Sequence, residues 1–296
     1  MNPRLSLKDA YSLFVLECES RHLSSHTLRF YNGRFSLILR WCDEQGIVHL
    51  DELTHHHIRQ YLVYVQERDV SSIYVHDFAK ALKAFLNYCV RDELIEVSPM
   101  KKVKMPKVEK KVLSAIDKLD IEKILKACRY ERDKAICLFL LDSGLRAREL
   151  LGLNVGDLNF ASGEVTVRLG KGQKGRTTYI GPKTRKQVLR YFIRERGGTP
   201  APRQSLFITQ DDKENRLNYE GLKQLFRRLK EETGVQFSAH SFRRTFAINS
   251  LRNGMNIYVL ARLMGHVDIT VLRVYLAITE VDLKAAHDQY GVVDNL

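Results

Sequence analysis

The stretch Ser143-Gly144-Leu145-Arg146-Ala147-Arg148-Glu149-Leu150-Leu151-Gly152-Leu153 predicts a glycine at the end of one helix and an arginine at the start of the next. A helix N-terminus attracts anions because its first N–H groups have no partners within the helix, and an arginine there adds bidentate recognition of a phosphate. An arginine in this place is also commonly solvated or ion-paired. The stretch alone therefore leaves both a structural and a phosphate-binding arginine open.

Three later segments also place basic residues in unusual local settings. Gly170-Lys171-Gly172-Gln173-Lys174-Gly175 lies between two alternating stretches, 164–169 and 177–180, which predict a β-hairpin with Lys171 at a glycine-flanked tip. His240-Ser241-Phe242-Arg243 sets a histidine and an arginine on one helical face. Gly265-His266 follows an apolar helix, and Tyr275 comes nine residues later. Each residue alone also fits an exposed, ion-paired or packing role, so the argument depends on their conjunction.

The charge of the chain points to an anionic partner. Its 48 lysines and arginines exceed its 35 aspartates and glutamates, which leaves a net charge of +13. The part up to Met105 carries only +1 of this excess, and the remainder carries +12. Nucleic acid is the simplest partner for such a surface, and a merely soluble basic surface is the alternative.

Length and composition exclude several classes of protein. The 296 residues suffice for two domains, and 44% hydrophobic with 28% charged residues is typical of a globular chain. The longest apolar run, Ala135 to Leu141, is too short to span a bilayer, and the N-terminus has no secretion signal. The five cysteines form no C-x-x-C pair. We expect a reduced, cytoplasmic protein.

The first hundred residues predict a small domain of four helices. Helical spacing of apolar residues begins at Leu7, and capping signals at Ser24, Thr54 and Ser71 precede three further segments. No strand pattern occurs before Ser98-Pro99, where the domain 1–100 is expected to end. Residues 113–296 predict a second domain, mostly helical, with helices expected over 121–128, 133–141, 184–196, 219–232, 242–252, 257–264 and 269–278.

Residues 101–112 predict an extended basic linker between the two domains. Two prolines bracket a run of positive charge here. The lysines of this run either follow a phosphate backbone or are simply solvated, and they are Lys101, Lys102, Lys104 and Lys107.

The histidine run His55-His56-His57 suggests a metal site at first sight. Adjacent residues on a helix point in different directions, so these three side chains cannot readily converge on one ion. We therefore predict a helix start here and no metal.

The conjunction of motifs resembles the tyrosine recombinase (phage integrase) family. Gly144-Leu145-Arg146 with Glu149 matches its first arginine box, and Gly170 to Arg176 matches its hairpin lysine. His240-x-x-Arg243 and Leu263-x-Gly265-His266 match the second box, and Tyr275 stands at the usual distance after it. The first domain is similar to the SAM-like core-binding domain of Xer-type members, through the stretch Ser24-Ser25-x-Thr27-Leu28-x-x-Tyr31.

Two departures set the chain apart from the housekeeping Xer pattern. Phe242 and Arg244 stand where the second box commonly has leucine and histidine, and Leu276-Ala277 replaces a common Thr-His pair. Neither departure falls on a catalytic position of the family. The resemblance implies a mainly α fold: a SAM-like four-helix core-binding domain, then an α-rich catalytic domain with a small antiparallel sheet.

The resemblance also implies a mechanism. Arg146 and Arg243 would hold the nonbridging oxygens of a DNA phosphodiester, which Tyr275 attacks to give a 3′-phosphotyrosine and a free 5′-hydroxyl. His240 is the candidate base and Lys171 the general acid. His266 would hydrogen-bond the phosphate, and Glu149 would orient the site. Neither metal nor ATP is implied, because cationic side chains take their place. Candidate DNA contacts are Lys101, Lys102, Lys104, Lys107, Lys174, Arg176 and Arg244.

The implied partners are duplex DNA sites and other copies of the chain. Four protomers would clamp and synapse two sites and exchange strands through a Holliday junction, with or without a second recombinase. The reaction would integrate or excise a mobile element or resolve replicon dimers. The apolar stripe Leu283, Ala286 and Tyr290 predicts a C-terminal helix that docks on a neighbouring protomer or on its own domain. The rival interpretations are a type IB topoisomerase and a non-catalytic DNA-binding protein.

Overall fold

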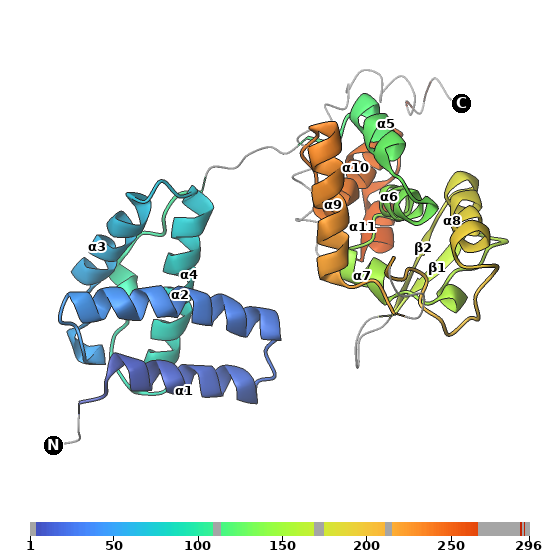
Figure 1. The fold of residues 1–296 in the computed structure, drawn as a ribbon. Coiled ribbons are helices and arrows are strands. Elements are labelled where there is room, and N and C mark those ends of the chain that lie inside the picture. Colours follow the sequence, from blue (N-terminus) through green and yellow to red (C-terminus); the bar gives the residue numbers. More distant parts are fainter. Residues whose placement is uncertain are drawn as a thin grey trace. The chain divides into compact units, whose positions relative to one another are not determined.

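The computed structural model describes residues 4–108, 114–168, 175–210, 215–265, 291 and 293. The chain divides into two compact units, Met1–Lys111 and Val112–Leu296, each with its own apolar core (Figure 1). Helices predominate, and the described residues contain one two-stranded antiparallel sheet. The predicted fold class is confirmed. Within the described residues no helix is long and apolar enough to cross a membrane, and all five cysteines are free thiols.

The first unit contains the four predicted helices. They are α1 (Leu7–Ser20), α2 (Ser25–Glu44), α3 (His55–Gln66) and α4 (Ser72–Arg91), with short 3-10 turns η1 (Leu50–Glu52) and η2 (Pro99–Lys102). The side chains of Ser24, Thr54 and Ser71 each accept a hydrogen bond from a main-chain N–H of the helix that follows. Helix α4 contacts the other three helices and supplies the fully buried Phe78, Ala79, Ala81, Leu82, Phe85, Leu86 and Cys89.

The run of three histidines begins α3. The His57 ring accepts a hydrogen bond from the main-chain N–H of Thr54 (3.3 Å), so it closes the helix N-terminus together with the Thr54 hydroxyl. Among the described residues, no group of three histidine, cysteine, aspartate or glutamate side chains is placed to hold a metal ion.

The prediction of an extended linker from residue 101 was wrong for the first part of that segment. Met100 and Val103 are buried in the core of the first unit, and Arg59 donates a 2.6 Å hydrogen bond to the main-chain oxygen of Lys102. The ring of His76 is hydrogen-bonded to the main-chain oxygen of Pro106 (3.0 Å). The physical reason is that two apolar residues three positions apart gain more by burial than this short segment gains by remaining extended. The four lysines at 101, 102, 104 and 107 themselves remain exposed.

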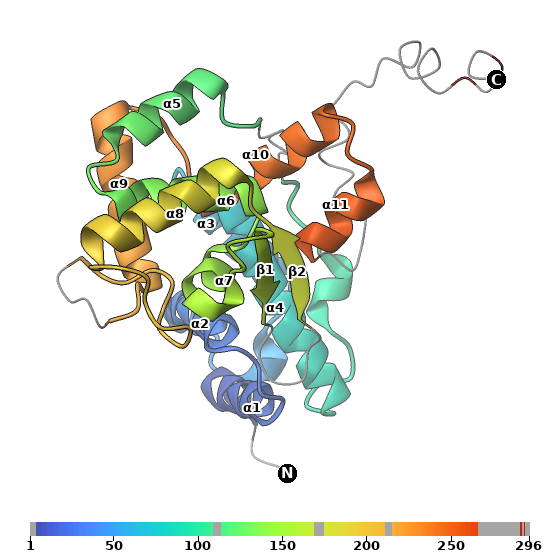
Figure 2. The same cartoon turned by 90° about the vertical axis from the view of Figure 1, so that its right-hand side faces the viewer.

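The second unit is built around α6 (Glu131–Ser143). Its residues Ala135, Ile136, Cys137, Phe139 and Leu140 are fully buried, because the helix is covered by α8 (Pro182–Glu195), α10 (Ala239–Arg252) and β2 (Arg176–Tyr179). The apolar run Ala135 to Leu141 thus lies in the central helix of this unit's core. Figure 2 shows α8 running alongside α6, and β2 next to α11 (Ile257–Met264).

The remaining elements complete this unit. They are α5 (Lys118–Ala127), α7 (Ala147–Gly152), the 3-10 turn η3 (Val155–Asp157), β1 (Glu164–Val167) and α9 (Tyr219–Thr233). Strand β1 pairs with β2 in antiparallel register, with Val167 opposite Arg176. The predicted helix over 269–278 and the C-terminal apolar stripe lie outside the described residues.

Candidate active site

The turn between α6 and α7 places Arg146. Gly144 ends α6 in the left-handed conformation, with φ of 62°. A Cβ atom at this position would lie only 2.3 Å from the Phe246 ring of α10. Glycine is therefore required for two reasons, the backbone conformation and the close approach of α10. This approach brings the helix that carries Arg243 to the start of α7.

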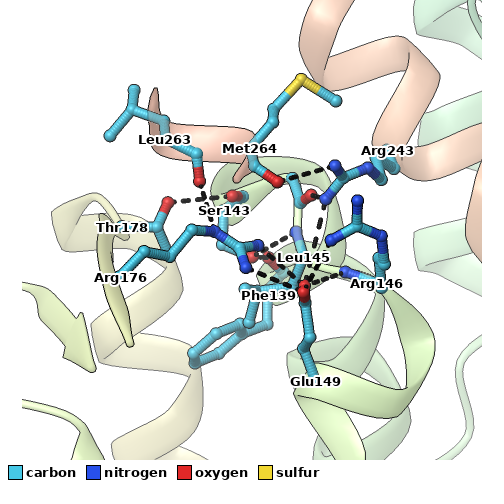
Figure 3. A network of polar contacts seen from close by, with 11 residues as sticks. Phe139, Ser143, Leu145, Arg146, Glu149, Arg176, Thr178, Arg243, Leu263 and Met264 are labelled. Atoms are coloured by element: carbon cyan, nitrogen blue, oxygen red, sulfur yellow. Dashed lines mark hydrogen bonds and ion pairs between the residues drawn. The ribbon is translucent and has the colours of Figure 1, made fainter. Parts of the chain in front are cut away.

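Glu149 lies at the centre of a cluster of arginines (Figure 3). Its carboxylate accepts hydrogen bonds from the main-chain N–H of Arg146 (2.7 Å) and from the Arg146 guanidinium (2.9 Å). The two terminal nitrogens of Arg176 donate to the two carboxylate oxygens, each at 2.8 Å. This bidentate pair is largely buried, since the Arg176 side chain is 10% exposed and that of Glu149 is 9% exposed.

Arg243 is held from the other side. Its side chain is 3% exposed, and one terminal nitrogen lies 4.0 Å from a carboxylate oxygen of Glu149. It donates hydrogen bonds to the main-chain oxygens of Gly144 (2.6 Å) and Met264 (2.8 Å) (Figure 3). Arg243 thus joins the α6–α7 turn to the end of α11.

The charges of this cluster do not cancel. Burial raises the pKa of Glu149, but the hydrogen bonds from Arg176 and Arg146 outweigh it and bring that pKa down to about 2. Glu149 is therefore ionised at neutral pH, and one carboxylate faces three guanidinium groups. The excess of two positive charges favours an anion beside the Arg146 guanidinium, whose side chain is 46% exposed.

His240 stands in the first turn of α10, three residues before Arg243. The pKa of its ring is lowered, first by partial loss of water and then by the charges of Arg244, Arg243 and Arg146. The ring is therefore mostly neutral near pH 7, which is the form that accepts a proton.

The structure brings together four of the residues predicted to act on the phosphate or to orient the site: Arg146, Glu149, His240 and Arg243. Lys171, Lys174, His266 and Tyr275 lie outside the described residues. Arg244 is partly buried and donates a 2.8 Å hydrogen bond to the main-chain oxygen of Ser114. The four lysines between 101 and 107 belong to the first unit.

Arg176 does not occupy the place that we predicted for it. We expected it to contact DNA from the hairpin, but its guanidinium donates to Glu149 and to the main-chain oxygen of Leu263 (2.9 Å). The reason is its position at the base of the hairpin rather than at the tip, directly opposite a buried carboxylate that needs a counter-charge. One sequence signal for this role was Glu149 itself, because a carboxylate directly before the apolar pair Leu150-Leu151 is expected to be partly buried and then requires partners.

Comparisons with known proteins agree with these features. Residues 114–281 match the phage integrase family, and residues 11–96 match the phage integrase N-terminal SAM-like domain. The tyrosine recombinase XerA of Saccharolobus solfataricus is 32% identical over 220 residues, which cover 74% of this chain and 68% of the relative. The tyrosine recombinase XerC of Pseudomonas syringae pv. tomato is 28% identical over 286 residues, covering 95% and 94%.

Solved structures show the same fold. The Tn1549 transposon integrase in complex with circular intermediate DNA superposes with a TM-score of 0.75 at 19% identity, covering 95% of this chain and 98% of that one. A crystal structure of XerA recombinase covers 96% of this chain and 98% of that chain, with a TM-score of 0.52 and 22% identity. The family matches and the similar recombinases confirm the predicted resemblance, and these solved structures share the fold.

Proposed function

This chain belongs to the phage integrase family of tyrosine recombinases, enzymes that cleave and rejoin DNA at specific sites, and from that premise we propose how its own residues carry out the reaction. The observation that carries the proposal is the cluster of Arg146, Arg176 and Arg243 around Glu149. It is a preformed cationic site in which three arginines, from the start of α7, from β2 and from α10, surround a single buried carboxylate.

Arg146 and Arg243 bind the nonbridging oxygens of the scissile phosphate. Arg146 is the accessible partner because nearly half of its side chain is exposed, whereas Arg243 is fixed by two main-chain carbonyls. Cleavage concentrates negative charge on these oxygens as the phosphorus becomes five-coordinate. Guanidinium groups that are already in place stabilise this charge without reorganising.

Tyr275 is the nucleophile. Its phenolic oxygen bonds to phosphorus, its proton passes to the His240 ring, and the bond from phosphorus to the 5′-oxygen breaks. The leaving 5′-oxygen takes a proton from the Lys171 ammonium, and His266 hydrogen-bonds the phosphate. The 3′-phosphotyrosine retains the phosphoester bond energy, so the 5′-hydroxyl of another strand rejoins it without ATP or a metal. The lowered pKa of His240 supports its role as the base.

The partners follow from this chemistry. Exposed lysines at 101, 102, 104 and 107, together with Lys174 and Arg244, bind the DNA backbone on either side of the cleaved phosphate. Four copies of the chain assemble on two synapsed duplex sites in the cytoplasm, on the nucleoid, and exchange one pair of strands at a time through a Holliday junction. The product is an integrated or excised element, or a resolved replicon dimer.

A type IB topoisomerase is the enzyme alternative. The match of residues 11–96 to the phage integrase SAM-like domain, and Xer relatives that span nearly the whole chain, favour the recombinase. The test uses a binding site selected from random DNA and placed twice on a supercoiled plasmid. We expect recombinant products whose topology depends on the relative orientation of the two sites. Relaxation of the plasmid with no recombinant would favour the topoisomerase and contradict the proposal.

A further inference from the structure

No step of the proposed reaction uses Arg176 directly. It stands at the start of β2, and its side chain is almost completely shielded from solvent. Three of its N–H groups have partners in two other elements: both carboxylate oxygens of Glu149 in α7, and the main-chain oxygen of Leu263 in α11. The Arg176 side chain therefore links β2 to α7 and α11 and is not a surface contact.

Resting on the proposed function, we propose that Arg176 is a positioning residue that occupies Glu149 so that Arg146 and Arg243 are left to bind the scissile phosphate, and that it holds the end of α11 from which His266 follows. Arg176 itself does not touch DNA. It acts through its partners.

The first half of the proposal rests on competition for one carboxylate. An ionised carboxylate accepts about four hydrogen bonds. Arg176 donates one hydrogen bond to each carboxylate oxygen, both at 2.8 Å. This planar, two-point arrangement is the one in which an arginine pairs best with a carboxylate. Without it, the buried charge of Glu149 would have to be satisfied by Arg146, already at 2.9 Å, and by Arg243, at 4.0 Å. Both phosphate-binding arginines would then be drawn onto the carboxylate.

The second half rests on the end of α11. The last carbonyl groups of a helix have no partner within it. Here Arg176 satisfies that of Leu263 (2.9 Å) and Arg243 satisfies that of Met264 (2.8 Å), as Figure 3 shows. The positive groups also complement the negative end of the helix dipole.

Gly265, which ends α11, shows how closely the Arg176 side chain packs against this helix end. Its φ is 67°, in the left-handed region. A Cβ atom at this position would lie 2.7 Å from Cδ and 2.9 Å from Cζ of Arg176. Gly265 therefore lies directly against the Arg176 side chain, and a change in that side chain changes the packing at the end of α11.

The test compares Arg176→Met, Arg176→Lys, Glu149→Gln and the double variant Arg176→Met/Glu149→Gln in the full chain. Arg185→Met is the matched control, because Arg185 is a partly buried arginine of the same unit that donates to the main-chain oxygens of Phe160 and Ala161. The measurements are the single-turnover rate of covalent adduct formation on a nicked DNA site, the affinity for that site and the thermal midpoint.

We expect Arg176→Met to slow cleavage by about 100-fold, a loss comparable to removing one charge-stabilising group from an active site, while site affinity changes by less than about threefold. Arg176→Lys should recover part of the rate, since an ammonium pairs with one oxygen only. The double variant should cleave about tenfold faster than Arg176→Met, because the neutral amide no longer draws Arg146 and Arg243 away. The rates are compared well below the thermal midpoint of every variant, because Glu149→Gln also removes the unpaired buried charge that would destabilise Arg176→Met.

The proposal is overturned if Arg176→Met cleaves at the wild-type rate, if its rate falls no further than that of an equally destabilised Arg185→Met, or if the double variant is no faster than Arg176→Met. Failure of the proposed function itself gives a different result, because the wild-type chain would then form no covalent adduct.

Discussion

Arg243 donates a 2.6 Å hydrogen bond to the main-chain oxygen of Gly144, a residue 99 positions earlier in the chain. The contact is buried, and it joins the turn that presents Arg146 to the helix that presents Arg243. The two arginines of the proposed phosphate site are thus fixed relative to each other by the backbone itself. Because such preorganisation removes the need for rearrangement during the reaction, it is the main structural basis of the proposed mechanism.

Replacing Arg243 with lysine should separate charge from geometry. Lysine keeps the positive charge, but it cannot reach the carbonyls of Gly144 and Met264 together with a phosphate oxygen. We expect cleavage of a nicked DNA site to fall by about 100-fold in single-turnover assays, with site affinity changed only a few-fold. Arg227→Lys, on the exposed side of α9, is the control and should cleave normally. An Arg243→Lys enzyme with the wild-type rate would show that a guanidinium group held by these two carbonyls is not needed for cleavage.

Glu149 should make stability depend on pH in a defined window. Its pKa is about 2 in the folded chain and near 4.3 in an unfolded one. A lowered folded pKa contributes stability that is present above the unfolded value and is lost as the pH falls toward the folded value. We therefore expect Glu149→Gln to cost roughly 2–3 kcal/mol at pH 7 in urea unfolding, and this difference to shrink between about pH 4.5 and pH 2. A difference independent of pH would show that Glu149 is not held ionised by its arginines.

Gly144 offers a test of packing at the turn. Gly144→Ala incurs about 1–2 kcal/mol for the left-handed conformation, and about 1–3 kcal/mol more for the collision with the Phe246 ring. The matched control is Gly234→Ala at the end of α9, where φ is 71° and no atom lies near the added methyl group. In chemical unfolding, Gly144→Ala should be the more destabilised variant by at least about 1 kcal/mol. Equal losses would mean that α10 does not pack on this turn as described.

The exposed lysines at 101, 102, 104 and 107 should contribute to DNA binding through charge alone. Each lost phosphate contact lowers the slope of log affinity against log salt by about 0.9. Replacing all four with alanine should therefore reduce the slope by about 3.6, measured by fluorescence anisotropy between 50 and 200 mM salt. Replacement by arginine keeps the charge and should keep the slope. If the alanine variant retained the wild-type slope, these lysines would simply be solvated.

The starts of helices α2, α3 and α4 could be predicted because their signals are local. Ser24, Thr54 and Ser71 bond to N–H groups three residues ahead, so the sequence near each position contains the whole interaction. The burial of Met100 and Val103 could not be predicted in this way. Their partners come from helices far back in the chain, and the surrounding lysines indicated a solvated segment.

The site was predictable in part for the same reason. Gly144, Arg146 and Glu149 lie within six residues, so the motif identified the turn and both site residues, although it did not predict that Arg146 pairs with Glu149. Arg176 meets Glu149 across 27 residues and Leu263 across 87. No local sequence pattern indicates contacts over such separations. Only the three-dimensional structure, in which the Arg176 side chain bonds to both α7 and α11, shows that this arginine is turned inward.

The central claim is that Tyr275 forms a covalent bond to DNA at the cluster around Glu149. The most direct measurement uses a nicked DNA site labelled at the 5′ end of the cleaved strand, quenched in detergent, with the attached peptide identified by mass spectrometry. The account predicts a covalent adduct on the peptide containing Tyr275, no adduct with Tyr275→Phe at unchanged site affinity, and a normal adduct with the control Tyr219→Phe, at an exposed tyrosine of α9. An adduct that persists in Tyr275→Phe, or a mapped peptide carrying a different tyrosine, would contradict it.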